Sequence, residues 1–560
     1  MRMKYITVLL LAMLFICRDL TVGQVETVPI SNQVYEFLER MAVKGVLPLY
    51  TNAMIPLSRK EVADNLVRIG EQREKLSTAE MEFLRKFQLE FSHEIDPASE
   101  NNTVLLRDPV FHDILSDREK YLYQYTDSAL TFYTELLGSI DHRIGSGDTY
   151  SSTNATLAEI GVRLRGTIKD RLGYSLRTTN GRLYGSRELA LRDQRLRSNV
   201  KFNDLNASYF DFVEAYLRAD LGWFDLQFGR EHARIGTGYS DRLLLSDNAP
   251  VFDALKIDFH HKWFRFTFLH GSLVNDSTLA SEWDLNKYLA MHRAQFSIGN
   301  LVNIGLSEMI IYQRRTLEFA YLNPINFYKS SEHSLKDRDN AFVSVDVEVF
   351  PMDRYKLYGT WLIDDIDFSK MGTGWWGNEF GWQGGVYVAE IAGVPDVDAV
   401  IEYTRLEPYV YSNRIAGNNY THRSIGLGHH LNPNSDEWLM ELSYQQSSRV
   451  RAWLSFAYER HGENFYFYGD PVEGPADYFI NYGGDILVGH SDSDSEIARF
   501  LDGVVNKTSR IQARLVIEPI TNIFISGIFE YSHSSKAASR AHGPWETDQV
   551  LAALRLFIEY

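Results

Sequence analysis

The residue types that most often carry chemistry are scarce in this chain, or stand at spacings that select no reaction. Cys17 is the one cysteine among 560 residues and lies near the N-terminus. Disulfides, cysteine-ligated zinc and cysteine nucleophiles are therefore excluded from the rest of the chain. Neither a Gly-x-Ser-x-Gly nucleophile motif nor a Gly-x₄-Gly-Lys-Ser/Thr phosphate loop occurs. We predict no catalytic residue, no cofactor and a protein that is not an enzyme.

Two motifs resemble binding sites without completing them. The Asp-x-Asp-x-Glu run at 492–496 begins like a calcium loop, but its glycine is missing and Gly503 stands where the closing glutamate belongs. The run at 372–377 matches Gly-x-Gly-x-x-Gly, yet it lies in an expected outer loop, so a dinucleotide site is excluded. Its Trp375 and Trp376 could stack on sugar rings or anchor the loop at the lipid interface. Both interpretations remain open.

Two histidine pairs, His260-His261 and His429-His430, are the remaining candidates for metal ligands. Each pair lies near an expected turn or strand end. Adjacent side chains of a strand point to opposite faces of the sheet, so we assign a metal site to neither pair.

The N-terminus carries a pattern of export. Basic residues precede an apolar run at 5–17, and Gly23 follows shortly afterwards, as in a secretory signal at 1–23 that is cleaved after Gly23. A lipoprotein with Cys17 as its lipid acceptor is the alternative, but the bulky Ile16 disfavours it. No later apolar stretch is long enough for a membrane helix. The net charge of -17 argues against a nucleic-acid partner.

Residues 31–92 have helical periodicity. Ser58 with Glu61, and Ser77 with Glu80, match the capping box, and an apolar stripe follows each. A three-helix unit of this length is small for an independent core, so we expect it to pack on something larger. We divide the chain into a signal peptide at 1–23, a periplasmic helical bundle at 24–95, a linker at 96–127 and a β-barrel at 128–560.

From residue 128 onward, apolar and polar residues alternate with a period of two. Ile160 and Val162, for example, alternate with Gly161 and Arg163. Short turns alternate with long polar connections at 181–207, 230–250, 271–288, 313–339, 365–379 and 461–507. A soluble sandwich would explain one apolar face per strand but not this alternation. The pattern is typical of an outer-membrane barrel with periplasmic turns and outer loops, and we predict an all-β transmembrane barrel.

The number of strands follows from parity. About nineteen candidates can be counted, but a bacterial barrel has an even number. Because 432–434 is interpreted as a periplasmic turn, we merge 437–460 into one strand with a bulge near Ser447, which leaves about 18 antiparallel strands. Such a barrel encloses an aqueous lumen unless loops fill it. The last strand ends at Tyr560 and resembles the assembly signal of outer-membrane proteins, which implies lipid and the barrel assembly machinery as partners.

The alternation also places charges of both signs in the lumen. The guanidinium fork of arginine suits carboxylate or phosphate recognition, so the set could form a ligand track. It could equally be a lattice of buried ion pairs that closes the barrel. The inward residues are Arg163, Arg165, Arg177, Arg218, Arg265, Arg293, Arg451, Arg510, Arg514, Glu214, Asp225, Asp258, Asp346 and Glu348.

The most distinctive segment spans 228–253. Its Leu243–Leu245 run would not stay exposed outside the cell, so we expect the segment to fold back into the lumen as a plug. The predicted ligand-binding or plug-forming residues are Arg230, Arg234, Asp241, Asn248 and Asp253, together with Trp375 and Trp376.

This segment resembles the hallmark region of the capsule assembly protein Wzi family. The resemblance rests on Gly229-Arg230, on Gly236-Thr-Gly238 and on Leu-Leu-Leu-Ser-Asp-Asn-Ala-Pro at 243–250, whereas Ile235 stands where the family often has tryptophan. A helical unit before a large barrel is a further similarity. The resemblance implies an outer-membrane barrel of the predicted size with a periplasmic helical bundle. It also implies a non-catalytic, lectin-like protein that helps to attach capsular or related polysaccharide to the cell surface.

We therefore expect a barrel in the outer membrane of a Gram-negative bacterium that binds capsular or other surface polysaccharide through its outer loops and upper lumen. A porin is the first alternative, because an open lumen would conduct ions. An outer-membrane lipid or glycan hydrolase is the second. It would need a nucleophile–base pair or a carboxylate pair at the outer rim, and no spacing in the sequence selects one.

Overall fold

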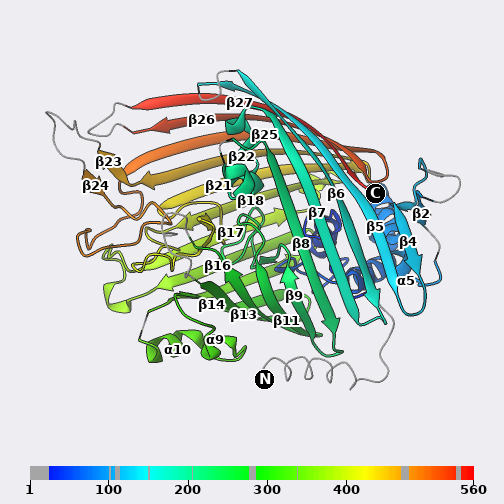
Figure 1. Ribbon diagram of the computed structural model, residues 1–560, viewed down its shortest axis with the longest axis horizontal. Coiled ribbons are helices and arrows are strands. Elements are labelled where there is room, and N and C mark those ends of the chain that lie inside the picture. The colour runs from blue at the N-terminus through cyan, green and yellow to red at the C-terminus, as the bar shows by residue number, and fades with distance from the viewer. Residues whose placement is uncertain are drawn as a thin grey trace.

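The computed structural model describes residues 24–99, 102–106, 114–148, 152–204, 206–275, 286–336, 338–467, 478–537 and 544–560. The predicted signal peptide, 1–23, lies outside the described residues. A ring of long strands surrounds a small group of N-terminal helices (Figure 1). Among the described residues, no helix is long and apolar enough to cross a membrane.

The N-terminal helices, together with the residues that join them (24–95), are called the helical head. They are α2 Val34–Val43, α3 Arg59–Gly70, α4 Thr78–Glu90 and α5 Ser92–Ile95, with a 3₁₀ turn η1 at Arg73–Lys75. Both predicted capping boxes are present: the Glu61 backbone N–H donates to the Ser58 hydroxyl at 3.2 Å, and the Ser58 N–H donates back to Glu61 at 2.9 Å. Ser77 and Glu80 repeat the arrangement. The apolar stripes meet in one buried core.

The barrel closes through 18 antiparallel strands, as the sequence predicts. Their bounds are β5 Thr131–Gly147, β6 Thr153–Ile168, β7 Leu172–Gly185, β8 Tyr209–Asp220, β9 Asp225–Arg230, β11 Asp253–His261, β12 Phe264–Leu273, β13 Lys287–Ile298, β14 Val302–Gln313, β15 Asn340–Met352, β16 Tyr355–Asp365, β17 Glu379–Val388, β18 Val397–Leu406, β21 Ser435–Ser447, β22 Val450–Glu463, β25 Val504–Ile520, β26 Ile523–Lys536 and β27 Trp545–Glu559. The last strand, β27, pairs with the first, β5. Outward positions carry exposed apolar side chains such as Ile160, Leu454 and Leu554, as a lipid-facing surface requires.

Shorter elements lie between and beside these strands. They are β1 Met54–Ile55, β2 Asn102–Val104, β3 Glu119–Tyr121, β4 Tyr123–Thr126, α6 Arg187–Ala190, α7 Gln194–Arg197, α8 Val200–Asn203, β10 Arg234–Ile235, α9 Phe319–Leu322, α10 Tyr328–Ser334, η3 Phe368–Lys370, η4 Ile391–Gly393, β19 Thr421–His422, β20 Ile425–Gly426, β23 Phe465–Phe467 and β24 Tyr478–Ile480. Strand β4 pairs with Thr131–Thr134 of β5. It thereby extends the sheet beyond the C-terminal residue, Tyr560, whose N–H donates to Leu136.

The prediction of a single strand at 437–460 is wrong, although the total of 18 strands is right. Strands β21 and β22 pair with one another across a tight reversal at 448–449. The residues 432–434 are not a periplasmic turn but the end of a long connection, 407–434, on the opposite side. Apolar residues such as Tyr420 and Leu427 make the sequence of this connection similar to that of a strand. In the structure they pack in the lumen and not against lipid.

Ion pairs hold the helical head in the mouth of the barrel at the end where the short turns lie. Arg40 is fully buried and pairs with Asp398 of β18 at 2.7 Å. Lys356 of β16 joins Glu39 of the head, at 2.5 Å, to lumenal Glu348, at 3.0 Å. Further pairs between head and barrel are Glu36–Arg451, Lys44–Glu390, Glu61–Arg265 and Lys86–Glu518. The head therefore fills this end of the lumen.

The connection between β9 and β11, residues 231–252, enters the lumen and is called the plug. Leu243, Leu244 and Leu245 are at most 2% exposed and pack against lumenal side chains that include Met291 and Met309. Strand β10 of the plug pairs with β1 of the head, with Met54 opposite Ile235. Head and plug therefore meet inside the barrel, and the predicted plug is confirmed.

A second long connection folds to the outside. Residues 314–336, here called the outer flap, carry α9 and α10 and lie beside the ring of strands (Figure 1). The N–H groups of Tyr328 and Lys329, at the start of α10, donate to the carboxylate of Glu308 at 2.7 and 2.6 Å. Glu308 projects from the outer side of β14 and is 3% exposed. The flap therefore covers a charge that would otherwise face lipid, where charges are costly.

Candidate functional site

The predicted ligand-binding residues fall into three separate places, of which the outer rim is the first. Arg230 ends β9 and Asp253 begins β11, and the two are directly opposed in the sheet. Two charge-assisted hydrogen bonds of 2.8 and 2.5 Å join them. Their side chains remain 42% and 50% exposed. The pair is thus accessible from outside but already neutralised.

The plug holds the second group. Arg234 pairs with Asp247 through bonds of 2.7 and 3.0 Å, which fix one plug strand to the end of the leucine run. Ile235, at the position where tryptophan is frequent in the family, is 2% exposed and packs with Met54 and Leu245 in the apolar core. The smaller side chain is therefore fully accommodated.

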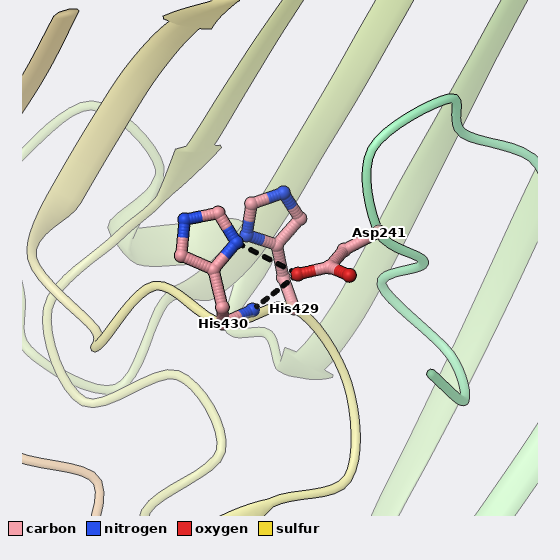
Figure 2. Close-up of side chains that lie close together, drawn as sticks. All are labelled: Asp241, His429 and His430. Atoms are coloured by element: carbon pink, nitrogen blue, oxygen red, sulfur yellow. Dashed lines mark hydrogen bonds and ion pairs between the residues drawn. The ribbon is translucent and has the colours of Figure 1, made fainter. Parts of the chain in front are cut away.

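Asp241 lies beside His429 and His430 (Figure 2), and Asn248 completes this polar cluster by donating to Asp241. One carboxylate oxygen, Oδ2, accepts from the Nδ1 and the backbone N–H of His430, at 2.7 and 3.1 Å, and from the amide of Asn248 at 3.1 Å. Asn248 also donates to the Gly428 carbonyl at 2.8 Å. The cluster therefore ties the plug to the connection 407–434.

Electrostatic interactions strengthen the contact between Asp241 and His430. Burial alone would raise the pKa of the Asp241 carboxyl, but the hydrogen bond and charge of His430 hold that pKa well below its usual range. Desolvation opposes a charge on His430, yet its bonds to Asp241 and Glu437 raise the pKa of the imidazole well above its ordinary value. His429 stacks on His430 with ring centres 4.5 Å apart. Burial lowers the pKa of His429 to about 4, so His429 is neutral beside a charged neighbour.

Trp375 and Trp376 form the third group, in an outer loop. Both indole N–H groups donate to one carboxylate oxygen of Glu496, at 3.1 and 3.2 Å. Trp376 also stacks face to face on His490 at 3.8 Å. The two tryptophans therefore join their loop to residues of the 478–503 connection, and the calcium-like acidic run supplies the acceptor.

The lumenal charges form ion pairs rather than an open track. Arg293 pairs with Asp346, Arg218 with Asp225 at 2.7 Å, and Arg177 with Glu214 at 2.9 Å. Arg163 and Arg165 share Glu135. The lattice interpretation is therefore confirmed for these residues.

Sequence reasoning missed the connection 407–434 and the partners that it supplies. His429 and His430 lie in this connection and not in a strand, so the argument from strand alternation does not apply to them. Two sets of residues place ligand atoms within 4.8 Å of one another: Asp241, His429 and His430, and His430, Glu437 and Glu459. The histidine doublet was the one local signal of this cluster, because its carboxylates come from distant segments.

The family described as capsule assembly protein Wzi matches residues 117–492. No curated protein sequence matches the chain. Among solved structures, Escherichia coli Wzi, described as an outer-membrane protein involved in group 1 capsule assembly and a carbohydrate-binding β-barrel, aligns with a TM-score of 0.56 and 12% identity, over 96% of this chain and 99% of its own. Pseudomonas aeruginosa OpdK with vanillate aligns with a TM-score of 0.43 and 8% identity, over 76% of this chain and 99% of its own. Since the family match spans more than half of the sequence, the chain belongs to the capsule assembly protein Wzi family.

Proposed function

We propose that this protein is a non-catalytic, lectin-like barrel of the Gram-negative outer membrane, exported by its N-terminal signal, that binds capsular or other surface polysaccharide and helps to attach it to the cell. Membership of the capsule assembly family supports the role. Escherichia coli Wzi, a carbohydrate-binding barrel with the same fold, supports carbohydrate as the ligand class.

The filled lumen is the observation that carries the proposal against a porin. The helical head occupies one mouth, and the plug packs with lumenal side chains in a buried apolar core. An 18-stranded barrel conducts because its lumen holds water, and here side chains take that space. The outer loops are left as the surface that can meet a large polymer.

Exposure divides the predicted ligand residues by role. Arg230 and Asp253 are about half exposed at the rim, and we assign them, with the tryptophan pair, to direct glycan contact. Aromatic rings and paired charges suit sugar rings and their hydroxyl groups. Arg234, Asp241 and Asn248 are bonded within the plug, and we assign them to positioning the surface above.

The test is deletion of the gene in its native host, with polysaccharide measured separately on cells and in the medium. We expect glycan to move from cells to medium at unchanged total. An unchanged distribution would contradict the attachment role. Conductance of the purified barrel in a planar bilayer, expected to be near zero, then decides whether it is a pore.

A further inference from the structure

Two lumenal glutamates stand directly opposite each other in the barrel wall. Glu437 of β21 and Glu459 of β22 are register partners. Both point inward, because Trp438, next to Glu437, and Leu454 and Phe456, at alternate positions of β22, are exposed on the outer face. Like charges at directly opposed positions destabilise a sheet. Within the described part of the chain, neither glutamate forms an ion pair with lysine or arginine, although the charge of Arg510 acts on Glu437 from nearby. The imidazole of His430 and the two carboxylates place ligand atoms within 4.8 Å of one another. A cation bound between them would offset the repulsion of the two glutamates.

His430 presents one ring nitrogen to these carboxylates and the other to Asp241. Its Nε2 lies 3.5 Å from Glu437 Oε2, and its Nδ1 lies 2.7 Å from Asp241 Oδ2. A histidine that binds a metal through one nitrogen commonly donates the other N–H to a carboxylate, which fixes the tautomer and the ring orientation. Asp241 is itself held by Asn248 at 3.1 Å, so this support is rigid.

The distances distinguish ligands from supports. Zinc binds imidazole nitrogen and carboxylate oxygen at about 2.0–2.2 Å, so two ligands of a tetrahedral site lie about 3.4 Å apart. The 3.5 Å between His430 and Glu437 matches this separation. The 2.7 Å between His430 and Asp241 is a hydrogen bond and leaves no room for an ion. His429 is also unsuited, because its Nδ1 accepts from the Leu431 N–H at 3.3 Å, which places the ring proton on Nε2 and leaves that nitrogen no lone pair for a metal.

We propose that His430, Glu437 and Glu459 bind one divalent first-row transition-metal ion, best fitted by Zn²⁺, with Asp241 positioning His430 from behind. One imidazole and two carboxylates are ligands that such ions accept, whereas calcium and magnesium prefer oxygen alone. The His430 side chain is 29% exposed, which gives the ion a path from solvent. The ion would fasten the connection 407–434 to the barrel wall, beside the plug.

The experiment uses the full-length barrel, purified in detergent and treated with a chelator, into which Zn²⁺ is titrated calorimetrically. We expect one equivalent to bind. The double substitution Glu437→Gln with Glu459→Gln should abolish this binding, and Asp241→Asn should weaken it about 10- to 100-fold, the usual effect of losing a supporting carboxylate. His533→Asn is the matched control, because His533 also pairs with a carboxylate, Asp548, at 3.0 Å, and it should leave binding unchanged.

Heat-modifiable migration on gels shows which variants are folded. In wild type, Zn²⁺ should raise the temperature of barrel unfolding, since binding to the folded state stabilises it. In the double glutamine variant it should not. The proposal fails if the wild type binds no stoichiometric Zn²⁺, in which case the side chains of His430 and Arg510 offset the charge of the glutamates without a metal. It fails equally if the folded double variant binds Zn²⁺ as tightly as the wild type, or if the loss is the same in His533→Asn.

Discussion

The Asp241 carboxylate in the plug already uses one of its oxygens for hydrogen bonds within the protein. Its Oδ2 accepts three hydrogen bonds, two of them from His430 and one from Asn248. An oxygen with three donors has no further lone pair to offer a glycan hydroxyl. The Arg230–Asp253 pair is different, because it is half exposed and can exchange one partner for another in water. Residues of the rim and of the plug should therefore respond differently to substitution.

The double substitution Arg230→Ala with Arg234→Ala should reduce the glycan held by cells. Arg230 loses a guanidinium at the rim, and Arg234 loses its bidentate hold on Asp247. An exposed ion pair such as Arg230–Asp253 contributes only about 0–1 kcal/mol to stability, so Arg230→Ala alone should leave the barrel intact and still lower retention severalfold. Cell-bound polysaccharide in the complemented deletion strain is the measurement. Unchanged retention by the folded double variant would remove both arginines from the site.

Glu231, the first residue of the plug, should make stability depend on pH. Burial raises the pKa of its carboxyl from 4.5 to about 7, although the Thr27 hydroxyl and the Gln227 amide donate to it. The folded state therefore binds more protons than the unfolded state between about pH 4.5 and pH 7, and stability falls as pH rises through this window.

The change that tests this is Glu231→Gln, which removes the titrating group. The unfolding temperature of the wild type in detergent should fall between pH 5 and pH 8, and that of the variant should fall less. Glu188→Gln, at an exposed position, is the control and should keep the wild-type slope. An equal slope in both variants would contradict the raised pKa.

At the scale of elements, short sequence patterns predict the helices and strands that depend only on nearby residues. The two capping boxes and the apolar stripes identify α3 and α4, and alternation identifies the strands of the barrel. The connection 407–434 could not be recognised, because its apolar residues pack on a plug that is far away in sequence. The same distance hides the partners of Asp241, since His430 lies 189 positions further along the chain.

The Ser58→Ala substitution should loosen the start of α3. The Ser58 hydroxyl accepts from the Glu61 N–H, and losing such a cap costs about 1 kcal/mol. Amide hydrogens in the first turn of α3 should then exchange about fivefold faster, as measured by hydrogen–deuterium exchange and mass spectrometry. Ser334→Ala in the outer flap is the control. Unaltered exchange in α3 would mean that docking to the barrel, and not the cap, holds this end of the helix.

The outer flap covers two polar side chains on the outer side of the barrel wall. Glu308 and His292 lie 3.3 Å apart on the outer side of the wall, where lipid would be expected. The flap brings backbone N–H groups to Glu308 and packs Tyr328 against His292, with ring centres 4.5 Å apart and the rings tilted by 41°. This sector of the outer wall is therefore lined by protein, and the lipid boundary passes around it.

In the whole molecule, three parts from different segments of the chain contact one another inside the barrel. The helical head, the plug and the barrel wall meet where β1 pairs with β10. Met54 of the head lies in the same apolar core as the plug leucines and the lumenal methionines. A cross-link between head and plug would therefore test whether the two parts meet inside the barrel.

A disulfide between Met54→Cys and Ile235→Cys should form under oxidising conditions. The two positions are directly opposed in an antiparallel pair, whose Cα atoms lie about 4.5–5.5 Å apart, within the range that a disulfide spans. The native cysteine, Cys17, lies in the predicted signal, and its replacement by serine in both variants keeps it from competing. Heat-denatured protein should migrate faster on a non-reducing gel. The control pair, Met54→Cys with Leu454→Cys on the outer wall, should not cross-link, and an equal shift in both would refute the contact.

The tethering of the plug has a consequence for biogenesis. Both of its ends are fixed at the outer rim by β9 and β11, so in a barrel that had already closed, the three leucines would have to pass through water to reach the interior. If the sheet is still open, they can lie on its concave face from the start. The hydrophobic effect therefore favours an order in which the plug is seated first. In this order, the pairing of β5 with β27 that closes the barrel forms last, after the plug is in place.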